Sequence, residues 1–139
     1  MKKILTAVMC ITAAALVLGC TSKKIDTPKL PSHDKVTGIE LSTSKDKNGI
    51  LIKPGSVTKD IMNIIKDTLK KEKDRGEEST NETPVNTDKF FTVSIYSNAD
   101  KAAIFHFYEK GGKKYMEKPY GGIWDISDEY YNKIMKITE

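Results

Sequence analysis

A histidine and several tyrosines in the second half of the chain are the side chains best suited to chemistry or recognition. In segments 89–97, 102–109 and 114–118, apolar residues fall at every second position, as in strands that bury one face. The set expected in the core is Phe91, Val93, Ile95, Phe105, Phe107 and Met116. The opposite face then carries Tyr96, Ile104, His106, Tyr108 and Tyr115. An exposed aromatic face is typical of a ligand or partner surface, whereas a helix or the polar segment 74–88 lying over it would make these residues a second core layer.

His106 is the only histidine of the expected domain, since His33 precedes it. One histidine without cysteines cannot build a structural zinc site, so we expect no metal and no cofactor. A catalytic triad would need His106 beside a serine such as Ser94 or Ser97, but the chain has no nucleophile-elbow pattern. No spacing of acids supports a carboxylate pair for glycoside hydrolysis. The sequence therefore favours a protein that is not an enzyme.

The string Glu117-Lys118-Pro119-Tyr120-Gly121-Gly122-Ile123-Trp124 is the most distinctive in the domain. It places a carboxylate, two aromatic rings and two glycines at the end of a strand. Tyr120 and Trp124 are candidates for the rigid aromatic anchors that dominate interface energetics. In the structural alternative, Pro119 ends the strand, the glycines turn the chain, and Ile123 and Trp124 fix the last segment to the core.

The elements that must position these residues begin with an alternating segment at 36–43, which predicts a strand. A short apolar run at 50–52 predicts a second strand. A helix capped by Ser56 or Thr58 follows, because apolar residues recur with helical spacing. These residues are Val57, Ile61, Ile64, Ile65 and Leu69. The polar stretch 74–88 predicts a mobile loop.

Three antiparallel strands, at 89–97, 102–109 and 114–118, and a short extended segment at 123–126 come next. Ser127 caps a final helix. Its apolar stripe is Tyr130, Ile134 and Ile137. The predicted fold is α+β, an antiparallel sheet in the order strand, helix, three-strand meander, helix, with helix packing on one face.

The N-terminal segment has the parts of an export signal. Lys2 and Lys3 precede an apolar run of about 15 residues, too short for a spanning helix, which needs about 20. The run ends in Leu16-Val17-Leu18-Gly19-Cys20, which resembles the lipobox of bacterial lipoproteins. The resemblance implies a lipoprotein signal peptide at 1–19, cleavage after Gly19 and a covalent diacylglycerol on Cys20.

The mature chain would then be a lipidated, flexible tether at 20–35 and a single domain at 36–139, with its loop at 74–88. Lipid of this kind gives stable anchoring. We expect the protein at the outer face of the cytoplasmic membrane, or at the periplasmic face of a membrane in a diderm bacterium. Cys10 would leave with the signal, so no disulfide forms and the core alone stabilises the fold.

The charge of the chain argues against nucleic acid as a partner. The net charge is +4, and removal of the two signal lysines would lower it to +2. Every basic residue except Arg75 is lysine. This bias suggests an AT-rich genome and, with the lipobox, a Gram-positive bacterium.

A longer pattern links the aromatic strand at 105–110 to the string that follows it. After a short basic turn, the chain reads Tyr-x-Glu-x-Pro-Tyr-x-Gly-Ile-aromatic, matched by Tyr115, Glu117, Pro119, Tyr120, Gly122, Ile123 and Trp124. This pattern resembles an uncharacterised domain of small Firmicutes lipoproteins and is similar to a segment appended to some BlaR/MecR-type membrane metallopeptidases. The resemblance implies an extracytoplasmic domain, suggests a sensory role and carries no catalytic residue.

The sequence thus favours a lipid-anchored, non-catalytic binding or sensing module with an envelope protein or cell-wall partner. The candidate binding residues are Tyr96, His106, Tyr108, Tyr115, Tyr120 and Trp124. Two other functions stay open: an immunity lipoprotein that occupies a toxin or an envelope enzyme, and an envelope hydrolase.

Overall fold

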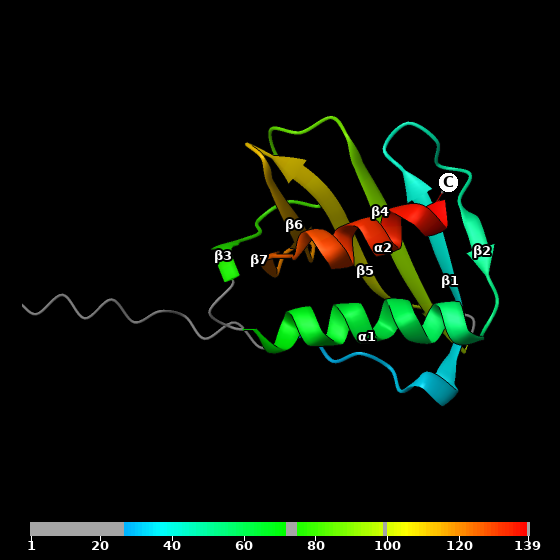
Figure 1. Cartoon of the computed structure of the whole chain (residues 1–139). Helices are drawn as coiled ribbons and strands as arrows, with labels where there is room; N and C mark the ends of the chain where they lie inside the picture. Colours follow the sequence, from blue (N-terminus) through cyan, green and yellow to red (C-terminus); the bar gives the residue numbers. More distant parts are fainter. Residues whose placement is uncertain (1–26, 72–74, 99, 139) are drawn as a thin grey trace, which may run out of the picture.

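The computed structural model describes residues 27–71, 75–98 and 100–138 (Figure 1). The expected signal peptide, Cys20 and the first residues of the tether lie outside these ranges. The elements are, in chain order, η1 (His33–Lys35), β1 (Val36–Thr43), β2 (Ile50–Ile52), α1 (Ser56–Lys70), β3 (Arg75–Glu78), β4 (Phe90–Ser97), β5 (Asp100–Lys110), β6 (Lys113–Glu117), β7 (Gly122–Asp125) and α2 (Asp128–Thr138).

The seven strands form one antiparallel sheet in the order β2-β1-β4-β5-β6-β7-β3. Strands β4 to β7 are neighbours both in the chain and in space, so they form a continuous meander. The turn between β5 and β6 uses Gly111 and Gly112, both with positive φ. With two helices beside this sheet, the fold is α+β.

The predicted element order is incomplete because segment 74–88 is not all loop. It contains the edge strand β3, which pairs with β7. The sequence of β3, Arg-Gly-Glu-Glu, has no apolar alternation, and its backbone pairing with β7 defines it as a strand. The extended segment predicted at 123–126 is the strand β7, and it joins β3 to the meander.

Both helices lie over the same face of the sheet (Figure 1). Apolar residues of α1 and Ile134 of α2 pack with the inward side chains of the strands to form the core. Val57 is 39% exposed and is not part of the buried stripe, because Thr58 takes the buried position in the first turn. Tyr130 and Ile137 of α2 are partly buried against the core.

The helix starts follow two different capping arrangements. The N-cap of α1 is Gly55, so the predicted caps Ser56 and Thr58 are wrong. The Thr58 hydroxyl instead accepts a hydrogen bond from the Gly55 N–H at 2.9 Å. At α2 the Ser127 hydroxyl accepts a hydrogen bond from the Tyr130 N–H at 3.2 Å, as predicted.

The predicted core face of the meander is confirmed. Its members are almost fully buried: Phe91, Val93, Ile95, Phe105, Phe107 and Met116. The Phe91 and Phe107 rings stack with their centroids 4.9 Å apart.

The folded part of the chain begins before Val36. Leu30 packs against the core, and η1 leads directly into β1. Within the described ranges, no helix is both long and apolar enough to cross a membrane.

Candidate functional site

The face of the sheet opposite the helices carries polar and aromatic side chains in two rows across the meander. Strand register sets both rows, since residues opposite each other on antiparallel strands share a face. The first row is Phe90, Tyr108, Tyr115 and Asp125. The second row is Thr92, His106, Glu117 and Ile123.

Residues 79–84, which we call the strap, connect β3 to the rest of the chain over this second face. The Ser79 hydroxyl donates to Glu117 Oε1 at 2.6 Å. The Glu82 carbonyl lies 2.9 Å from His106 Nε2. Backbone bonds from Ser79 N–H to the Gly121 carbonyl and from Tyr120 N–H to the Asn81 carbonyl hold the strap along the turn that follows β6. The strap therefore binds one residue from each of β5 and β6.

Both ring nitrogens of His106 are engaged. A carbonyl oxygen only accepts hydrogen bonds, so Nε2 carries the proton and donates to Glu82. Nδ1 is then free to accept from the Thr92 hydroxyl, 3.0 Å away. Burial lowers the pKa of His106, against the Glu82 carbonyl and the Glu117 charge, which raise it. The neutral His106 ring thus links the sheet, through Thr92, to the strap, through the Glu82 carbonyl.

Glu117 is the most unusual residue of this face. Its side chain is buried, with 2% of the residue exposed. Oε1 accepts the hydrogen bond from Ser79, whereas Oε2 has no hydrogen-bond partner within the described residues. Burial raises the pKa of Tyr108, followed by the charge of Glu117 and by a hydrogen-bonding interaction of the phenol with the Glu117 carboxylate, so the phenol keeps its proton and is a donor beside Glu117. Buried carboxylate oxygens normally have partners, so a solvent-shielded oxygen without one is an unusual feature of this face.

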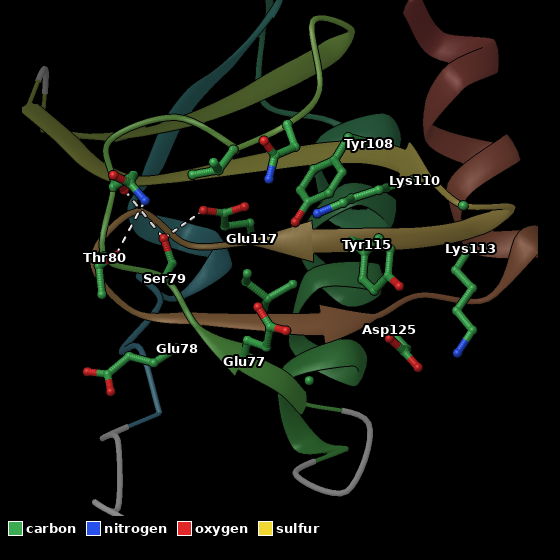
Figure 2. A pocket seen from close by; sticks show the side chains of 16 residues that line it. Glu77, Glu78, Ser79, Thr80, Tyr108, Lys110, Lys113, Tyr115, Glu117 and Asp125 are labelled. Atoms are coloured by element: carbon green, nitrogen blue, oxygen red, sulfur yellow. Dashed lines mark hydrogen bonds between the residues drawn. The ribbon is translucent and has the colours of Figure 1, made fainter.

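A cleft of about 740 Å³ opens beside Glu117, between the strap, the tip of the β5–β6 hairpin and β7. We call it the Glu117 cleft. Figure 2 shows Tyr108, Tyr115 and Glu117 on its wall, the Lys110 side chain beside Tyr108, and Lys113 toward the hairpin end. The Tyr108 and Tyr115 rings stack with centroids 5.4 Å apart. The charged residues that line the Glu117 cleft are Glu77, Glu78, Lys110, Lys113, Glu117 and Asp125.

A second hollow of about 460 Å³ is lined by His106, Thr92, Glu40 and Tyr120 among others. Strap residues line both hollows, so the strap lies between them. Tyr120 is 71% exposed and has a φ of 54°, a left-handed conformation that is uncommon for a residue with a side chain.

Of the two alternatives for the aromatic face, open or covered, the structure shows the covered one at two members. His106 is 5% and Tyr108 4% exposed, because the strap and neighbouring side chains cover them. Tyr115 and Tyr96 are half-buried, and the Tyr96 hydroxyl donates to Glu40 at 3.2 Å. At the centre of the sheet, part of segment 74–88, the strap, lies over the face opposite the helices.

Trp124 lies on the helix-covered face and is part of the core, with 4% exposed. A Cβ on Gly122 would come within 2.8 Å of its ring, so the glycine allows this packing. The structure thus gives Trp124 the structural role and separates it from Tyr120.

The residue that hydrogen bonds to His106 is Thr92, not the serines Ser94 or Ser97 considered for a triad. The sequence showed Glu117 as part of a distinctive string, but gave no sign of its burial or of Ser79 and Glu82. Only register and the strap bring them together. Among the described residues, no group of three His, Cys, Asp or Glu side chains is arranged to hold a metal ion.

The fold and the cleft define a small α+β domain with helices on one face and a strapped polar face on the other. The chain belongs to the family DUF5301, described as a domain of unknown function (DUF5300), which matches residues 24–125. The match includes all seven strands and α1. No curated protein and no solved structure matches the chain.

Proposed function

We propose that this protein is a lipid-anchored, extracytoplasmic binding or sensing module without catalytic activity, which engages its ligand or envelope partner through the Glu117 cleft. The observation that carries the proposal is Glu117 itself. A carboxylate that is 2% exposed, borders a cleft and has an oxygen without a hydrogen bond within the described residues is costly to maintain for stability alone. Ligand binding gives this arrangement a purpose.

Two sequence features support the location. One is the lipobox-like string ending at Cys20, and the other is the resemblance to Firmicutes lipoproteins and to the segment of BlaR/MecR-type metallopeptidases. The anchor predicts that Cys20→Ala releases the protein to the medium or leaves an uncleaved precursor. A processed variant still bound to the membrane would contradict the lipidation.

The binding role is tested by crosslinking the tagged, lipidated protein in intact cells and purifying what it captures. The Glu117→Gln variant is compared with the native chain. Its control is Glu129→Gln, the same change at an exposed residue of α2 on the helix side. The proposal predicts a captured partner or cell-wall fragment that Glu117→Gln loses and Glu129→Gln keeps. Equal capture by both variants would contradict a role for the cleft.

A further inference from the structure

We infer that the second hollow beside the strap binds a neutral pyranose ring, carried by a glycan or free as a sugar. Tyr120 is part of the lining of this hollow of about 460 Å³, and we call it the Tyr120 hollow. It shares no lining residue with the Glu117 cleft. The inference therefore goes beyond the proposed function and does not depend on the Glu117 carboxylate.

The floor of the Tyr120 hollow is an array of polar side chains set by strand register. Ser42 on β1 lies opposite Thr92 on β4, and Glu40 lies opposite Ser94 in the next row of the same face. All four residues line the hollow. Residues opposite each other are about 5 Å apart, and rows two residues apart along a strand are about 7 Å apart. The array therefore matches the width of one sugar ring.

Two hydroxyls of this floor can bind a ligand. The Thr92 hydroxyl donates to His106 Nδ1 at 3.0 Å, so its oxygen can still accept a hydrogen bond. Ser42 has a hydroxyl that can donate or accept. Both residues are partly exposed, so a ligand can reach them. A polyhydroxyl ligand supplies the donors and acceptors that these two groups require.

Glu40 adds a carboxylate that is held in place. The Tyr96 hydroxyl donates to Glu40 Oε2 at 3.2 Å. The side chain also lies against Gly49, where a Cβ would come within 2.5 Å of the Glu40 Cγ. Oε1 has no partner among the described residues and, unlike Glu117 Oε2, it is not shielded from solvent. It can therefore accept a hydrogen bond from a ligand hydroxyl at little entropic cost.

The charges around the Tyr120 hollow favour a neutral ligand. Two acids, Glu40 and Glu82, and two bases, Lys47 and Lys101, line it. The numbers are equal, and all but Glu40 are exposed, where water and salt screen their charges. Both ring nitrogens of His106 are already engaged in hydrogen bonds. The hollow thus has no excess charge with which to select an ion.

Tyr120 provides an apolar surface at the edge of the hollow. It is 71% exposed, and its φ of 54° is left-handed. The Tyr120 N–H donates to the Asn81 carbonyl at 3.3 Å, which holds this turn against the strap. Such a conformation is costly for a residue with a Cβ, and these outliers cluster at ligand sites. The C–H groups on one face of a pyranose can pack on the tyrosine ring while the hydroxyls bind the polar floor.

The test measures binding by calorimetry to the full chain in lauryldimethylamine oxide, because a detergent with a sugar headgroup would compete. The probes are chitotetraose, cellotetraose and the monomer N-acetylglucosamine. The controls are sorbitol, an acyclic polyol without a ring face, and inorganic phosphate, an anion. We expect at least one tetrasaccharide or the monomer to bind, and each control to bind at least about tenfold more weakly.

Tighter binding of chitotetraose than of N-acetylglucosamine assigns a glycan chain, and equal binding of the two assigns a free sugar. The inference would be overturned if no saccharide binds, if sorbitol binds as well as the saccharides, or if phosphate binds more tightly than all of them.

The first variant is Tyr120→Ala, which we expect to weaken saccharide binding at least about tenfold. Tyr120→Phe keeps the ring and should stay within about threefold of the native chain. The matched control is Ile50→Ala, which removes a side chain that is 57% exposed on the helix-covered face of β2. It should leave the affinity unchanged.

The second variant is Ser42→Ala, which removes a hydroxyl of the floor and should weaken binding at least about threefold. Circular dichroism checks that each variant folds. Full affinity in both Tyr120→Ala and Ser42→Ala would show that the saccharide does not bind in the Tyr120 hollow.

The failure of this inference can be distinguished from failure of the proposed function. If no saccharide binds but Glu117→Gln still loses its captured partner in cells, the inference is wrong and the binding role of the Glu117 cleft stands. If Glu117→Gln abolishes saccharide binding and Tyr120→Ala does not, the sugar binds in the Glu117 cleft and the Tyr120 hollow is not the site.

Discussion

The two faces of the sheet show how one set of strands can serve two purposes. The face under the helices is apolar and almost completely buried, with Phe105, Phe107 and Met116 at its centre. The opposite face buries Tyr108, His106 and Glu117, and the strap binds His106 and Glu117 through hydrogen bonds. The first face obtains its stability from area and close packing, and the second from a small number of directional contacts.

This difference teaches where function can reside. Apolar packing is tolerant of exchange between similar side chains, so it defines the fold without selecting a ligand. A buried polar face has specific donors and acceptors, and any that stay unpaired select a complementary group.

The largest effect is expected from the helix-covered face. Phe107→Ala should lower the free energy of unfolding by about 3–5 kcal/mol, because a fully buried ring leaves a cavity between sheet and helices. Tyr115→Ala, on the other face, should lower it by only about 1 kcal/mol, since the ring is half-buried. Urea denaturation measures both, and equal losses would contradict the assignment of the core to one face.

The next effect concerns the strap. Ser79→Ala should lower the free energy of unfolding by about 1.5–3 kcal/mol, because it removes the hydrogen bond to the Glu117 carboxylate. Thr83→Ala, at an exposed strap position, should change it by less than about 0.5 kcal/mol. Urea denaturation again provides the measurement, and a Ser79→Ala value no larger than that of Thr83→Ala would mean that the hydrogen bond contributes nothing.

His106 should make the second face sensitive to acid. Its pKa is lowered in the folded protein, so the unfolded chain binds the proton more readily. Stability from this group is complete above the ordinary value of 6.5 and is lost as the pH falls below 6.5 toward the folded value. Denaturation midpoints between pH 7.5 and 5 should therefore fall more in the native chain than in His106→Gln.

The His106→Gln chain serves as the control. Subtracting its pH-dependent change in denaturation midpoint from that of the native chain removes the contribution of carboxylates such as Glu82 and Glu117. An identical pH dependence in both would show that His106 is not the acid-sensitive group.

The smallest effect on stability is expected at Tyr120. Its side chain is 71% exposed, so Tyr120→Ala should change the free energy of unfolding by less than about 0.5 kcal/mol. If the partner covers both hollows beside the strap, Tyr120→Ala should nevertheless reduce the amount of partner captured by crosslinking in cells. A loss of more than about 1 kcal/mol in thermal denaturation would indicate that the ring supports the fold instead.

The sequence predicted the core face because alternation along a strand is a local property with a period of two residues. Phe91, Val93 and Ile95 therefore reveal their direction without knowledge of their neighbours. The strap has no such period. Its position depends on one hydroxyl, Ser79, and one backbone carbonyl, at Glu82, which meet residues far along the chain.

The same reason explains the errors at individual site residues. Trp124 looks like an interface anchor until the register of β7 turns it toward the helices. The sequence places Glu117 in a distinctive string but does not show that its carboxylate is buried. Side-chain type and spacing were visible, but burial of a polar residue depends on long-range contacts that a single sequence does not display.

The most direct test of the central claim is amide hydrogen exchange of the full chain in its membrane, measured with and without the crosslink-identified partner. The account predicts added protection in the strap and in β5 and β6 around Tyr108 and Glu117, with no change in α1 or α2. Protection confined to the helices or to the β2 edge would contradict the claim that the strapped face is the binding face.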